Sequence, residues 1–267
     1  MSYFQHKVVL VTGGSAGLGQ AIARAFAQEG ARVVITARGR QRLSQTASQL
    51  QDQGGDVTWV AADITQQSQV DDLLAQILQQ FQDLHVLVNN AGQSARGWAS
   101  QTSPEQHLEL LQLNFLGLVR CSRAALPHLT RSQGHLVNMG SLSSKVATPY
   151  LGAYPASKFA VAAYSQQLRL ELQPKGVHVL LVCPGPISRQ DSGPRYDQQA
   201  DDLPARASGP GGGAKLRALS PDWVAARILR ACRQRQPELV LPSKARLLFA
   251  LAQLCPSWGD WILKKMA

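Results

Sequence analysis

The chain has 267 residues, of which 45% are hydrophobic and 16% are charged, a balance typical of a folded soluble protein with a sizeable core. Its four cysteines are far apart and form no C-x-x-C pair, which argues against a disulfide framework and a zinc site, so no metal is predicted. The formal net charge of +10 indicates binding to nucleic acid, binding to an anionic membrane, or a generally basic surface without such a partner.

The same features indicate where the protein works. Residues 1–7 (M-S-Y-F-Q-H-K) lack the apolar core of a signal peptide, and the separated cysteines fit a reducing compartment, so a cytoplasmic location is predicted. The basic residues are scattered, without aromatic-basic interleaving or a helix-turn-helix pattern. No nucleic-acid partner is therefore predicted.

The first pattern along the chain is a strand, a glycine-rich loop and a helix. A β-branched run at residues 7–12 predicts a buried strand, and G-G-S-A-G-L-G follows it at once. Gly13, Gly17 and Gly19 would permit a tight turn and a close approach to a pyrophosphate, which the N-terminus of the helix would attract. The alternative is an ordinary strand-to-helix turn. The strand and helix on either side favour a dinucleotide site, with these predicted contacts: Gly13, Ser15, Ala16, Gly17, Leu18 and Gly19.

The second predicted strand, residues 32–38, ends without an acidic residue. An Asp or Glu there would accept hydrogen bonds from both ribose hydroxyls of NAD, whereas this chain has Ala37 and Arg38. A guanidinium suits a 2′-phosphate, so NADP(H) is the predicted cofactor and Arg38 its phosphate ligand. The alternative is that Arg38 is a solvated charge in a loop that begins a helix.

The next two strands also end in polar residues. After a helix over about 40–53 and a strand over 56–61, Asp63 either caps the next helix or contacts an adenine amino group. The fourth strand ends in N-N-A-G, and ligands of doubly wound sheets lie outside the carboxyl ends of strands. These residues are therefore assigned to the cofactor: Asp63, Ile64, Asn90, Ala91 and Gly92.

A helix predicted over about 103–129 carries Asn114 in its middle. Asn has a poor helix propensity and competes for backbone hydrogen bonds, which indicates a special role or a local bend. The fifth strand, residues 135–141, delivers Ser141 to the same edge of the sheet. Tyr154 and Lys158 share one face of the helix predicted over 154–172, because they are four residues apart.

These side chains suit proton transfer. A tyrosine has an ordinary pKa of ~10, and a neighbouring ammonium group favours the phenolate and lowers that pKa toward neutrality. Ser141 would supply a neutral hydrogen-bond donor for a substrate oxygen.

Strand and helix alternate six times, which predicts one domain with a parallel sheet and helices on both faces. The sixth strand is followed by P-G-P-I, where Pro184, Gly185 and Ile187 are predicted cofactor contacts. Residues 188–219 lack periodicity, which predicts either a mobile functional loop or disorder. Because the segment follows the sixth strand at the carboxyl edge, it is a candidate lid over the substrate.

A further helix and a seventh strand lead to the C-terminal extension, residues 243–267, which is apolar and basic. Its apolar run is too short to span a bilayer. Two interpretations remain, packing against the domain or a partner subunit, and peripheral contact with anionic lipid through its aromatic and basic residues.

Residues 7–187 resemble the short-chain dehydrogenase/reductase family in the order, spacing and type of their motifs. The resemblance rests on T-G-G-S-A-G-L-G (12–19), N-N-A-G (89–92), Asn114, Ser141, Y-P-A-S-K (154–158) and P-G-P-I (184–187). It implies a Rossmann sheet in the order 3-2-1-4-5-6-7, and dimers or tetramers paired through the helices that carry Asn114 and Tyr154. Many relatives have a Thr where this chain has Arg189, so only Ile187 is carried over as a nicotinamide contact.

The resemblance also implies the catalytic roles. Tyr154 is expected as the general acid/base, Ser141 as the residue that polarises the substrate oxygen, and Lys158 as the ligand of the nicotinamide ribose. Asn114 is expected to support a water-linked proton relay. The predicted function is an NADP(H)-dependent interconversion of a carbonyl and an alcohol, with a lipophilic substrate such as a steroid, retinoid or long-chain ketone. The alternative is a non-catalytic NADP-binding sensor or scaffold.

Overall fold

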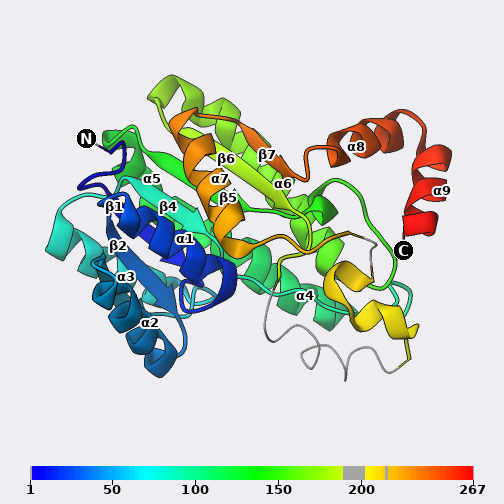
Figure 1. Ribbon diagram of the computed structural model, residues 1–267, viewed down its shortest axis with the longest axis horizontal. Helices are drawn as coiled ribbons and strands as arrows, with labels where there is room; N and C mark the ends of the chain where they lie inside the picture. The colour runs from blue at the N-terminus through cyan, green and yellow to red at the C-terminus, as the bar shows by residue number, and fades with distance from the viewer. Residues whose placement is uncertain (1, 189–201, 214–215, 267) are drawn as a thin grey trace.

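The computed structural model describes residues 2–188, 202–213 and 216–266 (Figure 1). Its strands form one sheet in the order β3-β2-β1-β4-β5-β6-β7, and every neighbouring pair is parallel. The predicted Rossmann topology is therefore confirmed. The strands are β1 (Val8–Thr12), β2 (Arg32–Ala37), β3 (Asp56–Ala61), β4 (Val86–Asn89), β5 (His135–Met139), β6 (His178–Pro184) and β7 (Glu238–Leu241).

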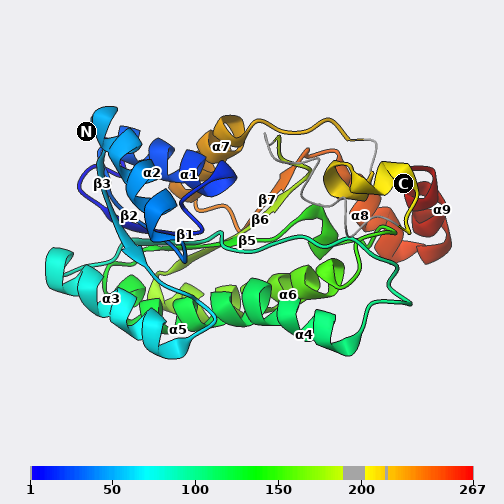
Figure 2. The same ribbon diagram turned by 90° about the horizontal axis from the view of Figure 1, so that it is seen from below.

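Helices cover both faces of the sheet, as Figure 2 shows. One face carries α1 (Gly17–Gln28), α2 (Arg40–Asp52) and α7 (Pro221–Arg233). The other carries α3 (Gln67–Phe81), α4 (Pro104–Leu111), α5 (Gly117–Arg131) and α6 (Tyr154–Leu172). Residues of β1 alternate between the two cores, Val9 and Val11 facing one and Val8 and Leu10 the other. Because both faces are buried, the central strands read as continuous apolar runs.

The register aligns the carboxyl ends of the central strands. Val11 pairs with Val88 across β1 and β4, and Asn89 pairs with Asn138 across β4 and β5. The loops that follow these strands therefore leave the sheet at one edge, where ligands of doubly wound folds bind.

The helix predicted over residues 103–129 is wrong in its middle. The structure has α4, then a π-helical segment η1 (Gln112–Leu116), then α5. Asn114 lies at the centre of η1 and is buried, with its side chain in hydrogen bonds to other segments. The wider π turn is a local deviation of the kind that the poor helix propensity of Asn114 indicated. Such turns often occur at functional positions.

The C-terminal extension forms two helices, α8 (Ala245–Leu254) and α9 (Pro256–Met266), beyond the carboxyl end of β7 (Figure 1). Phe249 and Leu263 are buried with Leu181 and Val240 of the sheet, so one side of the extension packs on the chain itself. Among the described residues, no helix is long and apolar enough to cross a membrane.

The predicted loop over residues 188–219 lies only partly within the described residues, and Arg189 lies outside them. The described part contains two short 3-10 turns, η5 (Ala205–Ser208) and η6 (Pro210–Gly212). Its far end returns to the segment just after β6, because Ile187 and Leu219 form an isolated parallel bridge.

Candidate active site

A cavity of about 660 Å³ lies at the carboxyl edge of the sheet. Its walls bring together segments that are more than 200 residues apart in the chain, from α1 to α9. Nine of the residues predicted from the sequence line it: Leu18, Asn90, Gly92, Ser141, Tyr154, Lys158, Pro184, Gly185 and Ile187.

The glycine-rich turn after β1 is packed so closely that side chains are excluded. A Cβ atom on Gly19 would overlap the carbonyl oxygen of Gly13 and lie 2.5 Å from the amide nitrogen of Asn90. Gly13 has a φ of +65°, and a Cβ there would lie 2.9 Å from the Cα of Ala91. The close contact of the turn with the loop after β4 therefore requires glycine at both positions.

Thr12 and Asn90 hold this turn against the end of β4. The Thr12 hydroxyl oxygen accepts hydrogen bonds from the backbone N–H groups of Asn90 and Ala91, each at 3.0 Å. The Asn90 amide donates to the carbonyl oxygens of Thr12 and Gly13 at 3.0 and 3.2 Å. Asn90 was predicted as a cofactor contact, and its amide group braces the turn. Thr12 was not singled out, because a threonine at the end of a strand is common.

The end of β2 lies beside the glycine-rich turn, since Gly13 N–H donates to the Thr36 carbonyl at 2.8 Å. Arg38 follows β2 and is exposed at this edge. The next helix, α2, carries no acidic residue in its first turn. The end of β2 thus combines the Arg38 guanidinium with the N-terminus of α2, and both attract a phosphate group.

Asp63 does not cap the following helix, so that predicted alternative is wrong. The N-cap of α3 is Gln66, whereas Asp63 Oδ1 accepts from the backbone N–H and the hydroxyl of Thr65, at 2.9 and 2.8 Å. The carboxylate is used in a turn ahead of the helix. Ile64 is buried and packs against Gly117, where an added Cβ would lie 2.8 Å from its side chain.

Asn114 links three segments beneath the cavity. Its Oδ1 accepts from the Gln93 N–H at 2.8 Å, and its Nδ2 donates to the Gln93 carbonyl at 2.8 Å and the Ser157 hydroxyl at 3.0 Å. The contacts fix the loop after β4 and the first turns of α6 relative to η1. Gln93, which lines the cavity, was missed because a backbone contact leaves no pattern in the sequence.

Lys158 is buried beside the cavity. Its ammonium group donates to the Met139 carbonyl at 2.8 Å and lies 5.8 Å from the centroid of the Tyr154 ring. Burial lowers the pKa of Lys158 from 10.5 to about 8. The side chain therefore still carries its charge at neutral pH, close to the phenol.

Ser141 lies just beyond β5, which ends at Met139 rather than at residue 141. Its hydroxyl oxygen accepts from the Ser143 N–H at 3.1 Å, and the Ser144 hydroxyl accepts from the Ser141 N–H at 3.0 Å. This reciprocal cap of the short helix η2 (Leu142–Ser144) fixes the direction of the serine side chain. Its O–H proton can then be donated into the cavity.

Arg96 is a buried residue of the cavity wall that the sequence did not reveal. Its guanidinium donates to the Ala207 carbonyl at 2.7 Å and the Gly209 carbonyl at 2.9 Å. It also bonds the Ser94 hydroxyl and the Ala95 carbonyl, at 3.0 and 2.8 Å. Arg96 thus ties the described part of the loop after β6 to the loop after β4.

One wall of the cavity comes from the C-terminal helices and is apolar, with Lys244 at the start of α8 beside it. It is formed by these side chains of α8 and α9: Leu247, Leu248, Phe249, Leu251, Ile262 and Leu263. The cavity therefore combines the polar groups of Ser141, Tyr154 and Lys158 with an apolar wall.

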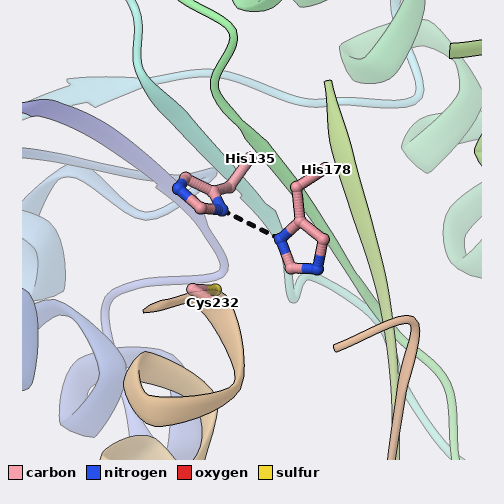
Figure 3. Close-up of side chains that lie close together, drawn as sticks. All are labelled: His135, His178 and Cys232. Atoms are coloured by element: carbon pink, nitrogen blue, oxygen red, sulfur yellow. Dashed lines mark hydrogen bonds between the residues drawn. The ribbon is translucent and has the colours of Figure 1, made fainter. Parts of the chain in front are cut away.

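A second cluster of titratable residues lies at the amino ends of β5 and β6, away from the cavity. Figure 3 shows His135, His178 and Cys232, whose donor atoms lie within 4.8 Å of one another. The Gln236 carbonyl can only accept, so His178 carries its proton on Nε2 and accepts from His135 through Nδ1, at 2.7 and 2.8 Å. The Tyr3 hydroxyl then donates to His135 Nε2 at 3.0 Å. Through these hydrogen bonds the two histidines link the N-terminal segment to the sheet, which explains why they lie together.

Comparison with known proteins agrees with the observed fold. A family model described as short chain dehydrogenase matches residues 7–200. A dehydrogenase/reductase SDR family protein 7-like of Drosophila melanogaster is 31% identical, over 98% of this chain and 80% of its own length. The ketoacyl reductase HetN of Nostoc is also 31% identical, over 99% of this chain and 90% of its own length. The crystal structure of a variant of actinorhodin polyketide ketoreductase with NADPH superposes with a TM-score of 0.79 at 26% identity, covering 90% of this chain and 97% of that one.

Proposed function

The chain belongs to the short chain dehydrogenase family, and on this premise we propose that it interconverts a carbonyl and an alcohol with NADP(H) as hydride carrier. The observation that carries the proposal is the lining of one cavity by Ser141, Tyr154 and Lys158, beside the glycine-rich turn. Three polar groups that suit proton transfer thus lie next to a site that suits a dinucleotide.

The residues at the carboxyl edge fit such a cofactor. The glycine-rich turn leaves no room for a Cβ at Gly13 or Gly19, which is the cradle that a pyrophosphate requires. The N-terminus of α1 begins at Gly17 and carries no acidic residue in its first turn. NADP(H) held here supplies the hydride for reduction and accepts it for oxidation.

Tyr154 and Ser141 act on the substrate oxygen. In reduction Tyr154 donates its proton to that oxygen, and in oxidation it removes the proton, while the Ser141 hydroxyl donates a hydrogen bond. The Lys158 ammonium stabilises the phenolate that forms, because an opposite charge nearby favours the ionised phenol. Asn114 is a positioning residue in this scheme, since its amide is bound to Gln93 and Ser157.

The preference for NADP(H) over NAD(H) rests on Arg38. A guanidinium and the N-terminus of α2 favour a 2′-phosphate at the end of β2, where no carboxylate is available for two ribose hydroxyls. The adenine contact of Asp63 belongs to the same proposal.

The apolar wall of the cavity supports a lipophilic substrate. Phe249, Ile262 and Leu263 would bury the hydrocarbon part, and the carbonyl would face Tyr154. Two similar proteins are named for the reduction of ketoacyl and polyketide carbonyls, which agrees with this substrate class.

The test is a screen of carbonyl compounds and alcohols that follows NADPH absorbance. A series of ketones with lengthening alkyl chains should show kcat/KM rising with chain length, because each buried CH₂ contributes about 0.8 kcal/mol. Binding of NADPH with no turnover of any carbonyl in the screen would support the sensor or scaffold alternative instead.

We further propose a homodimer or homotetramer in the cytoplasm, paired through α4, α5 and α6. Leu108, Phe159 and Leu170 are exposed large apolar residues on α4 and α6, and they would be buried in such an interface. Light scattering of the wild type and of Phe159→Glu would test the pairing, with a lower mass expected for the variant.

A further inference from the structure

The C-terminal helices have an apolar side that the rest of the chain does not cover. Four large side chains of α8 and α9 are exposed: Leu247 by 79%, Leu254 by 86%, Trp258 by 66% and Trp261 by 59%. In each helix they recur at intervals of three or seven residues, which places them on one face. We call these four residues the tail face.

Basic residues surround the tail face. Lys244 and Arg246 are exposed at the start of α8, and Lys264 and Lys265 are exposed near the end of α9. Lys265 Nζ lies 3.8 Å from the centroid of the Trp261 ring. Asp260 is the one acidic residue among residues 243–267. Aromatic rings flanked by lysines suit the boundary between lipid chains and anionic headgroups.

The opposite side of the same helices lines the proposed substrate cavity. Leu248 and Ile262 face the cavity together with the buried Phe249 and Leu263. Leu247 belongs to both surfaces, since it lines the cavity and is also exposed. The cavity therefore opens beside the tail face.

The two helices are held together at a close crossing. A Cβ atom on Gly259 would lie 2.7 Å from both the Cα and the Cβ of Ala252. The glycine lets α9 pack directly on α8, which keeps the exposed side chains of the two helices close together.

We propose that the tail face docks on an anionic membrane surface, and that a lipophilic carbonyl substrate enters the cavity directly from the lipid. A second copy of this chain is a poorer occupant, because a two-fold interface would bring together two copies of a surface that has four basic residues and one acidic residue. The entry of substrate rests on the proposed function, whereas the docking can be measured without turnover.

Docking is tested by co-sedimentation of the full-length protein with phosphatidylcholine vesicles, with and without phosphatidylserine. The test variants are Trp258→Ala/Trp261→Ala and Lys264→Glu/Lys265→Glu. Helix α7 offers a matched control, Trp223→Ala/Arg227→Glu, because Trp223 is exposed and the Arg227 guanidinium lies 5.8 Å from the centroid of its ring.

The wild type and the α7 control should bind vesicles that contain phosphatidylserine, and binding should weaken as salt is raised. Each tail variant should bind at least about tenfold more weakly, since one loses two interfacial aromatic rings and the other loses two basic residues that the anionic surface attracts. Equal binding by all variants, or no binding by the wild type, overturns the docking. A tail variant that changes from dimer to monomer in light scattering, when the wild type binds no vesicles, assigns the face to a second copy instead.

Substrate entry is tested with two ketones, one soluble in water and one partitioned into vesicles. The tail variants should reduce the soluble ketone at the wild-type rate and the vesicle-bound ketone several-fold more slowly. Equal rates for both ketones would overturn the entry route alone. Failure of every protein to reduce the soluble ketone would overturn the proposed function, while the vesicle-binding result would still stand.

Discussion

Both polar atoms of the Asn114 side chain are hydrogen-bonded to the backbone of one residue, Gln93. Oδ1 accepts from its N–H and Nδ2 donates to its carbonyl, each at 2.8 Å. This pairing joins the π-helical segment η1 to the loop after β4, in the wall of the cavity. The unusual helix geometry and the position of the active-site loop thus depend on each other.

Replacement of Asn114 by Ala should lower the free energy of unfolding by about 2–3 kcal/mol, because the buried Asn114 side chain makes three hydrogen bonds, each with a net contribution of about 1 kcal/mol. It should also lower kcat, since Gln93 and Ser157 are no longer held. Urea unfolding measures the first effect. Glu109→Ala, an exposed change on α4, should alter stability by less than about 0.5 kcal/mol. Equal stability of the two variants would contradict the positioning role.

Tyr154→Phe should reduce turnover by at least about 10²-fold, because it removes the proton donor while the ring stays in place. NADPH binding, followed by fluorescence, should survive. Tyr164→Phe is the matched control on the same helix, where the tyrosine ring packs against Phe115. Near wild-type turnover in Tyr154→Phe would rule out its role as acid/base.

Arg38→Asp should shift the preference from NADPH toward NADH, because a carboxylate repels the 2′-phosphate and can accept from the ribose hydroxyls. The ratio of kcat/KM for the two cofactors measures the shift. Lys175→Asp makes the same charge change just before the amino end of β6, at the opposite edge of the sheet, and should leave the ratio unchanged. An unchanged ratio in Arg38→Asp would count against the phosphate contact.

Gly19→Ala should abolish cofactor binding and lower Tm, since its Cβ would overlap the Gly13 carbonyl and the turn would have to move. Gly39→Ala is a suitable control, because Gly39 has no heavy atom within 4 Å of an added Cβ and a φ of −86°. Differential scanning fluorimetry should show a large loss of Tm for the first variant and little change for the second. Similar losses in both would contradict the steric argument.

The linked histidines predict that acid destabilises the fold. Burial lowers the pKa of His135 to about 3, and burial also lowers the pKa of His178. Below the unfolded pKa of about 6.5 the unfolded chain binds protons that the folded chain excludes. Stability should therefore be greatest above that pH and fall below it, by up to about 1.4 kcal/mol per pH unit for each group.

Chemical unfolding over a range of pH measures this slope. The variant His135→Gln/His178→Gln should have a flatter profile, because neither state then binds protons at these positions. His6→Gln changes an exposed histidine of the N-terminal segment and should keep the wild-type slope. If the double variant has the wild-type slope, other groups cause the acid sensitivity.

Much of the fold follows from local patterns in the sequence. The predicted bounds of the helix Tyr154–Leu172 agree with α6, and the glycine-rich loop lies between a strand and a helix as expected. Such patterns are readable because burial of one helix face or of a whole strand requires apolar residues at regular intervals. The carboxyl edge of the sheet could then be predicted as the place where the motif residues meet.

The tertiary structure decided what these residues touch. In the folded chain Asn90 donates to the glycine-rich turn, and Arg96 donates to the carbonyls of Ala207 and Gly209. The C-terminal helices line the cavity. The tertiary structure also joined His135 to His178 and inserted the π turn around Asn114. None of these contacts has a local signature, because each depends on how segments far apart in the chain pack together, and periodicity encodes only which face of a segment is buried.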